Sequence, residues 1–448
     1  MNSRMNSKTV ALLIGLALIT ANSFQITAQA EEGTDRRFIQ VAAKTKEERS
    51  AIANTGMSIE AVRSDSVWGF ANPETLKILR ENGSKILGNF EFKVARGGHQ
   101  DGFDFPAKDA KFHNYQEVTS GLRMLANSHA DIAQMSSIGK SIEGKQLWAL
   151  HINTTPGALM DKKSNKPGIL FVANHHAREH LSVEMPLMLA QHLLNNRNDT
   201  QIAAMLENRD IWIIPMLNPD GAEHDIQGQN YAFWRKNRRD NKDGTFGVDM
   251  NRNYGFGWGT GGSSKDTSSD VYMGTAPFSE PETLALKDFV ESHLNIKILL
   301  SFHTFSELIL YPWGHKYDSI ENTKDLTAYK AMAETMAKWN HYTPQQSSEL
   351  YIASGDTTDW SYGEHGIFSF TFELSPGGSS GAGGFYPGAG IIDRVFQDNL
   401  RPCLYLIDLA DDPHRASGGG ASSWLKNYRA STIDWSKNWD VLGASSIR

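Results

Sequence analysis

The sequence predicts an α/β protein that has one large domain and a smaller α/β unit in front of it. Short, fully apolar runs such as residues 168–173 and 296–302 indicate buried strands, and the amphipathic stretches between such runs indicate helices. A stretch rich in glycine and charge, residues 91–110, separates the two units. The 448 residues are enough for more than one domain.

Composition and charge describe an ordinary soluble globule. The chain is 40% hydrophobic and 21% charged, and its formal net charge is −7. A mildly acidic protein lacks the basic surface that nucleic-acid binding requires. We therefore expect no nucleic-acid partner.

Residues 1–30 are typical of a signal peptide for export. They combine a positive start (Arg4 and Lys8), an apolar core at 10–20 that is too short to span a bilayer, and the small residues Ala28 and Ala30 at a cleavage site. No second long apolar run follows. We expect bacterial export, a secreted or periplasmic location, and no membrane segment in the mature form.

The small unit, residues 34–90, alternates strand and helix patterns. One helix begins with the capping box of Thr45 and Glu48, and another begins with Pro73 at its first position. We identify no metal-binding or nucleophilic cluster in this unit. Strands are expected at 38–42, 65–71 and 84–89, and helices at 45–54 and 73–81.

The large domain continues the same alternation. Before it, Arg96 and two glycines in the exposed linker form a plausible site of proteolytic cleavage. After it, residues 413–448 begin with a Gly/Ser stretch that predicts a flexible linker and a tail. Strands are expected at 146–153, 168–173, 211–217, 296–302, 306–311 and 368–374. Helices are expected at 114–128, 182–194, 280–294, 324–339 and 391–409. We expect Pro402 to interrupt the last of these helices and the lone Cys403 on it to be a buried thiol.

The polar residues of 174–180 follow directly after the apolar strand 168–173. Open α/β sheets place their sites at the carboxyl ends of strands, and imidazole and carboxylate are zinc ligands. His176 and Glu179 fit a pair of ligands completed by a distant histidine. Adding His180 gives the inverzincin pattern, in which both histidines bind the metal and Glu179 acts as base. A polar turn without metal is the third possibility.

Two further residues break apolar strands. His303 follows the run 296–302, and Glu373 lies within the run 368–374. An ionised carboxylate on an apolar strand is costly unless it is paired or faces a cleft, so Glu373 is a functional candidate. The remaining polar clusters are the basic run 234–238, the segment 248–254 and the loop 351–360.

Together these motifs resemble the zinc carboxypeptidase family of the carboxypeptidase A type, and most closely its bacterial carboxypeptidase T branch. The resemblance covers residues 114–411. It implies a mixed central β-sheet flanked by helices for residues 106–412, preceded by a ferredoxin-like activation prosegment with a cleavable linker at 31–105. The motifs that carry the resemblance are His176-x-x-Glu179, the expected turn Asn218-Pro219-Asp220-Gly221, Trp234-Arg235-Lys236, Asn251-Arg252-Asn253, His303, Tyr351, Ser354-Gly355 with Asp359-Trp360, and Phe370-Thr371-Phe372-Glu373.

The resemblance implies one Zn²⁺ bound by His176, Glu179 and His303, with His175 and His180 not acting as ligands. Glu373 would take the proton of the attacking water and pass it to the leaving amine. Arg235 would stabilise the oxyanion of the intermediate. Asp249 would accept a hydrogen bond from the free ring N–H of His176.

The resemblance also implies a set of substrate contacts. Asn251 and Arg252 would hold the terminal carboxylate, Tyr351 would close over the substrate, and Arg178 would lie further along the cleft. Thr358 would form the floor of the side-chain pocket, with Thr371 beside it. Because Thr358 is uncharged, the pocket does not require a charged side chain on the substrate. Asp356 is expected either to meet a Lys or Arg tip or to cap its own turn and face solvent.

The expected function is therefore an exported zinc metallocarboxypeptidase that releases one C-terminal residue from peptides or proteins. It would accept hydrophobic side chains well and basic ones measurably, and its own prosegment would inhibit it until cleavage. Two alternatives stay open from the sequence. One is a cell-wall peptidase of the same fold acting on peptidoglycan peptides, and the other is a non-catalytic peptide-binding protein.

Overall fold

The computed structural model describes residues 36–91, 102–161, 164–377, 383–420, 422–426 and 428. The expected signal peptide, the expected cleavage point at Arg96 and residues 429–448 lie outside this range. Within the described residues, no helix combines the length and the apolar character needed to cross a membrane.

The small unit has an antiparallel sheet of four strands in the order β2-β3-β1-β4, and its elements follow one another as β-α-β-β-α-β. The capping box of Thr45 and Glu48 forms as predicted. Strand β2 was not predicted, because its five residues mix serine and glutamate with apolar positions. The elements are β1 (Arg37–Ala42), α2 (Lys46–Ala53), β2 (Ser58–Val62), β3 (Ser66–Ala71), α3 (Pro73–Glu81) and β4 (Ile86–Glu91).

The large domain is built on a mixed eight-stranded sheet in the order β11-β10-β12-β9-β7-β8-β6-β5. Its four central strands run parallel to one another and are almost wholly buried, as their apolar sequences predict: β7 (Gly168–Ala173), β8 (Asp210–Ile214), β9 (Ile296–Ser306) and β12 (Phe368–Gly377). The outer strands are β5 (Ala133–Lys140), β6 (Gln146–Ile152), β10 (Leu308–Tyr311) and β11 (Thr343–Gln346), of which β5 and β11 were not predicted.

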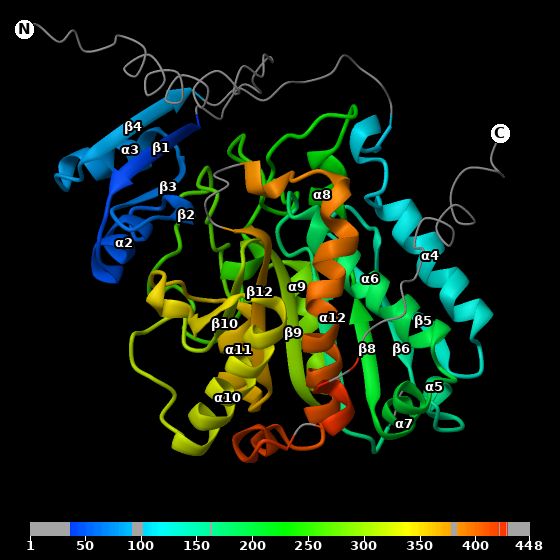
Figure 1. Ribbon diagram of the computed structural model, residues 1–448. Helices are drawn as coiled ribbons and strands as arrows, with labels where there is room; N and C mark the ends of the chain where they lie inside the picture. Colours follow the sequence, from blue (N-terminus) through cyan, green and yellow to red (C-terminus); the bar gives the residue numbers. More distant parts are fainter. Residues whose placement is uncertain are drawn as a thin grey trace, which may run out of the picture.

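Helices cover both faces of this sheet (Figure 1). Successive side chains of a strand point to opposite faces, so Leu300 and Leu299 of β9 belong to two different cores. One core contains α4 (Tyr115–Ser128), α6 (His180–Asn195), α7 (Thr200–Asn208), α10 (Thr323–Asn340) and α12 (Ile392–Leu409). The other contains α9 (Pro281–Ser292) and α11 (Thr357–His365). The remaining short helices are α5 (Ala158–Asp161) and α8 (Pro219–Asp225).

Two local predictions for the large domain are wrong. Helix α12 runs through Pro402 without interruption. The turn expected at 218–221 is the start of the short helix α8, because the Asn218 side chain accepts a hydrogen bond from Gly221 N at 3.1 Å and Pro219 occupies the first helical position. Cys403 is buried as expected, and burial raises the pKa of its thiol.

The segment after α12 is not the flexible linker that its composition predicts. Residues Pro413–Gly418 form a 3-10 helix, and Leu425, in a second one at Ser423–Lys426, is fully buried in the main core. Arg415 donates to the Asp408 backbone carbonyl and to Asp411, and the Ser422 hydroxyl donates to the Asp408 carboxylate at 2.6 Å. These contacts with the last turn of α12 override the local flexibility of the glycines.

The small unit, blue in Figure 1, lies beside the large domain with β2 as its nearest strand. Several ion pairs join the units, among them Arg36 with Asp270 at 3.0 Å and Lys46 with Glu349 at 2.6 Å. Arg49 adds a hydrogen bond to the Leu350 carbonyl. Arg36 lies just before β1, whereas Lys46 and Arg49 belong to α2, so the small unit is held at several points.

Candidate functional site

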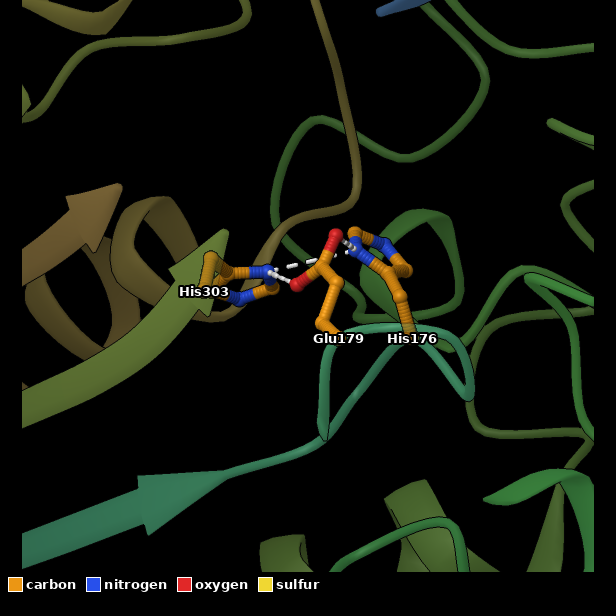
Figure 2. A group of neighbouring side chains, drawn as sticks. All are labelled: His176, Glu179 and His303. Carbon is orange, nitrogen blue, oxygen red and sulfur yellow. Dashed lines mark hydrogen bonds and ion pairs between the residues drawn. The ribbon is translucent and has the colours of Figure 1, made fainter. Parts of the chain in front are cut away.

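The site begins where the parallel neighbours β7 and β9 end. His176 and Glu179 lie in the loop between β7 and α6, and His303 lies near the end of β9 (Figure 2). The loop turns sharply at Asn174, which has a φ of 60°, a left-handed conformation that asparagine tolerates better than most residues. The Asn174 side chain then donates to the His176 carbonyl at 3.0 Å, which fixes the turn.

The three side chains converge on one point. His176 Nδ1 is 2.7 Å from Glu179 Oε1, and His303 Nδ1 is 3.0 Å from Glu179 Oε2. The two Nδ1 atoms are 3.2 Å apart, and the potential ligand atoms of all three residues lie within 4.8 Å of one another. Two imidazole nitrogens and one carboxylate facing the same small space fit a zinc ion that keeps a fourth position open.

Asp249 connects the metal group to Arg235. His176 Nε2 is 3.2 Å from Asp249 Oδ1, so the carboxylate orients the ring from its far side. Arg235 Nε donates to Asp249 Oδ2 at 3.0 Å, and Arg235 Nη2 lies 2.9 Å from the same oxygen in an ion pair. Although burial opposes it, the attraction of Arg235 and His176 holds the pKa of Asp249 well below its usual range. Arg235 is thereby fixed beside the metal group with its charge retained.

The neighbouring histidines point elsewhere. His175 Nε2 is 2.8 Å from the Tyr254 hydroxyl, and His180 Nε2 is 2.8 Å from Asp225 Oδ2. Within the described part of the chain, the group of His, Cys, Asp and Glu side chains that could hold a metal consists of His176, Glu179 and His303. The geometry thus disfavours the inverzincin alternative, because His180 does not face the other two ligands.

A cavity of about 430 Å³ opens beside the metal group. Glu373 enters it from β12, where it is the register partner of His303 on β9. Burial, with repulsion from Glu179, raises the pKa of Glu373 well above its usual range. The predicted residues that line the cavity are His176, Glu179, Arg235, Asn251, Arg252, Tyr351, Asp356, Thr358, Thr371 and Glu373.

The side chain of Asp356 caps its own helix, which was one of the two expectations for this residue. It also lines the cavity, where the other expectation placed it. Its Oδ1 accepts from Thr358 N and Asp359 N, both at 2.9 Å, and from the Thr358 hydroxyl at 2.6 Å. Burial, with repulsion from Asp359, raises the pKa of Asp356 to about 7. The carboxylate therefore borders the cavity rather than bulk solvent.

One wall of the cavity belongs to the small unit, which was expected to inhibit the enzyme, but the residues that form this wall were not identified from the sequence. Residues 59–63 of β2 and the following turn line the same space as the metal group. Glu60 is 2.6 Å from Arg178 Nη2, and the Tyr351 hydroxyl donates to the Ile59 carbonyl at 3.4 Å. The small unit thus contributes a charged side chain to the site, and the charged residue between Ile59 and Ala61 was the available signal in the sequence.

Arg178 is the predicted substrate contact that does not line the cavity. Its side chain is fully buried between the Phe70 ring of the small unit and the Phe385 ring of the large domain, 5.4 and 4.3 Å from the ring centres. Phe385 belongs to an aromatic cluster with Phe233 and Phe305 at this end of the cavity. No sequence pattern identified Phe385, which follows a glycine-rich stretch of sequence.

Comparisons with known proteins agree with one another. The family described as zinc carboxypeptidase matches residues 118–401. A zinc carboxypeptidase from Saccharothrix mutabilis subsp. capreolus is 35% identical, covering 86% of this chain and 91% of that protein. Carboxypeptidase A1 of Rattus norvegicus is 30% identical, covering 69% of this chain and 71% of that protein. The solved carboxypeptidase A from Helicoverpa armigera shares the fold, with a TM-score of 0.67 at 23% identity over 87% of this chain and 100% of that one.

Proposed function

This chain belongs to the zinc carboxypeptidase family, and from that premise we propose that it is an exported proenzyme with broad C-terminal specificity. As a family member it is a zinc metallocarboxypeptidase, a hydrolase that acts on peptide C-termini with one Zn²⁺. The export proposal rests on the signal-like residues 1–30. The proenzyme and specificity proposals rest on the geometry of the cavity.

The residues around the metal group divide the chemistry among them. Zn²⁺ held by His176, Glu179 and His303 would supply Lewis-acid polarisation of a water molecule and of the scissile carbonyl. Glu373 accepts the proton of the attacking water and later delivers it to the leaving nitrogen. Arg235, fixed by Asp249, donates to the oxyanion that develops on the former carbonyl.

Arg252 and Asn251 recognise the terminal carboxylate of the substrate. Arg252 uses Nε and Nη1 on the carbonyls of Gly262 and Asn251, which fixes the guanidinium and leaves Nη2 for a ligand. The Asn251 Oδ1 accepts from Thr357 at 3.0 Å, so the amide nitrogen is the donor that remains. Two fixed donors beside a cavity suit a carboxylate, and Tyr351 at its rim closes over the bound peptide.

The side-chain pocket accepts more than one class of residue. Thr358 and Thr371 give it neutral hydroxyl walls, and Leu310 adds apolar surface. Asp356 offers a carboxylate to a basic tip, directly or through a water molecule. We expect C-terminal Phe, Tyr, Leu and Met to be removed well, Lys and Arg measurably, and Asp and Glu poorly, because Asp356 repels them.

The position of β2 is the observation that supports a proenzyme. A peptide substrate needs the space beside the metal group, and residues 59–63 line that space. Tyr351 also donates to the Ile59 carbonyl, which keeps it from a substrate. Residues 31–105 would therefore inhibit the enzyme until the linker is cut.

A panel of blocked dipeptides with varied C-terminal residues tests the function. The zinc-loaded, proteolytically activated chain should release the C-terminal residue with the order of rates given above. Hydrolysis confined to peptides that end in D-alanine would favour the cell-wall alternative. A zinc-loaded chain that binds the peptides and cleaves none would favour the non-catalytic one.

A further inference from the structure

His175 is a buried histidine beside the metal group that the chemistry described above does not use. Its side chain is fully buried, and its ring is stacked with the ring of the ligand His303, with the ring centres 5.3 Å apart. Its Nε2 atom is 2.9 Å from the Thr357 hydroxyl and 2.8 Å from the Tyr254 hydroxyl, and its Nδ1 atom is 3.4 Å from the Ser301 hydroxyl. A buried imidazole with hydroxyl partners at both nitrogens has a fixed orientation.

The Thr357 hydroxyl connects His175 to Asn251. Thr357 is the first residue of α11 and is buried, and both its backbone N–H and its hydroxyl donate to Asn251 Oδ1 at 3.0 Å. A hydroxyl has one proton and can accept as well as donate. When that proton is donated to Asn251, the hydroxyl oxygen accepts from the Nε2–H of His175. The three side chains therefore form one chain of hydrogen bonds.

The two donors of Thr357 fix the direction in which the Asn251 amide faces. The oxygen and the nitrogen of an amide occupy nearly equivalent positions, so a rotated amide exchanges an acceptor for a donor. Two donors at Oδ1 oppose this rotation, because they would then face the NH₂ group. Asn251 lines the cavity, and its Nδ2 atom is thus the atom available to an acceptor there.

Resting on the proposed function, in which Asn251 holds the terminal carboxylate of the substrate, we propose that Thr357 and His175 are positioning residues for this recognition. Thr357 keeps the amide donor of Asn251 directed at the carboxylate. His175 donates to the Thr357 oxygen and so keeps the hydroxyl proton directed at Asn251. Neither positioning residue lines the cavity, so both act through Asn251 and not on the substrate.

The same chain of hydrogen bonds connects the carboxylate contact to the metal group. His175 directly precedes the ligand His176. Ser301 belongs to β9, the strand that carries the ligand His303, and Thr357 begins α11. The loop after β7, strand β9 and helix α11 are thus joined by buried side chains. The separation of the metal group from the terminal carboxylate determines how many residues follow the scissile bond, so a fixed separation suits the release of one residue.

Two ligands that differ only at the carboxylate measure this role without turnover. Hydrocinnamate and hydrocinnamide carry the same phenyl ring, and calorimetry gives their Kd values on the zinc-loaded, activated chain. The ratio of the amide Kd to the acid Kd reports recognition of the carboxylate, and Arg252→Gln should bring this ratio near one. Thr357→Val should lower the ratio about three- to tenfold, the size of one net hydrogen bond. Thr357→Ser keeps the hydroxyl and should keep the ratio.

Steady-state kinetics separates positioning from general damage to the site. On a blocked dipeptide ending in Phe, Thr357→Val should raise KM by the factor found in the Kd ratio and leave kcat nearly unchanged, because the contact holds substrate and transition state equally. His175→Phe should act in the same direction. The double variant should show no larger effect than Thr357→Val alone, because the two residues act through one contact.

The matched control is Thr119→Val, which removes from α4 a hydroxyl that donates to the Tyr115 carbonyl at 2.8 Å and should leave the Kd ratio at the wild-type value. An unchanged ratio in zinc-loaded Thr357→Val, or in Thr357→Ala if the valine variant does not fold, overturns the proposal. A wild-type ratio near one also overturns it, and additive losses in the double variant overturn the role of His175. A wild-type chain that binds hydrocinnamate and cleaves no peptide instead contradicts the proposed function, so the two failures are distinct.

Discussion

Glu373 has a local environment that its sequence neighbours do not share. Phe372 and Leu374 on either side of it are fully buried, whereas Glu373 is turned to the cavity by the alternation of strand β12. Its register partner is the ligand His303. Burying a carboxylate on this strand costs free energy and contributes nothing to its packing. Its presence in an apolar run therefore indicates a functional site.

The change Glu373→Gln should abolish most turnover and leave zinc content unchanged. The amide keeps the size of the side chain but cannot accept the proton of the attacking water, and general acid–base catalysis contributes about 10²–10⁴-fold. Single-turnover kinetics on the zinc-loaded variant, with metal analysis as the control, measures this loss. A near-normal kcat would remove Glu373 from the mechanism.

The metal group predicts different outcomes for two histidine variants. His303→Ala should lose zinc, because it removes one of three protein ligands, and should lose the rise in Tm that zinc gives the folded state. His180→Ala is the matched control, since its ring bonds Asp225. Metal analysis and thermal unfolding with and without chelator test both. Zinc loss in His180→Ala alone would restore the inverzincin reading.

Asp356 predicts a specificity that depends on pH. Because its pKa is raised to about 7, this carboxyl is neutral below pH 7 and ionised above it. Attraction for a basic tip should therefore appear as the pH rises through 7, and the Lys-to-Leu ratio of kcat/KM should increase several-fold. In Asp356→Asn the ratio should be low and flat. A wild-type ratio that does not change with pH would leave Thr358 as the sole determinant.

At the scale of elements, the ends of β7, β9 and β12 bring the site together. These strands are parallel neighbours, so residues near their carboxyl ends meet at one edge of the sheet. His303 and Glu373 come from the strands themselves, while His176 and Glu179 come from the loop after β7. The two sides of the site thus rest on a buried sheet, which limits their movement.

The residues after α12 should contribute to the stability of the fold, although their Gly/Ser-rich composition does not indicate this. Leu425 is fully buried in the main core, so Leu425→Ala should lower the free energy of unfolding by about 2–5 kcal/mol. Denaturant unfolding measures this directly. A chain that ends at Asp412 should be destabilised further, because it also loses Ala416 and Arg415. Unchanged unfolding in both would mean that the segment packs only loosely.

For the whole molecule, the position of the small unit predicts latency. Residues 59–63 line the substrate space, and ion pairs from Arg36 and Lys46 hold the unit in place. Limited proteolysis of the linker should raise peptidase activity, because the released unit then dissociates by mass action on dilution. Zinc content before and after the cut is the control. Equal activity in both states would make the small unit a permanent domain or a folding aid.

Much of the architecture follows from local patterns. The central strands are short apolar runs, the capping box at Thr45 and Pro73 begin helices where expected, and the order of motifs identified the family. Strands β2, β5 and β11 escaped prediction, because partly polar strands owe their state to pairing with neighbours. The linker after α12 escaped it because its glycines are ordered by Arg415, Ser422 and Leu425.

The sequence by itself determined the types of side chain that the site uses, because zinc ligands, a strand carboxylate and an arginine–asparagine pair are recognisable by residue type and spacing. Only the tertiary structure decided which of the clustered histidines face one another and that Glu60 reaches Arg178. The physical reason is that ligand geometry and ion pairing depend on distances between segments far apart in the chain. A bulge in β2 and the docking of one unit on another set those distances, and neither leaves a clear local pattern.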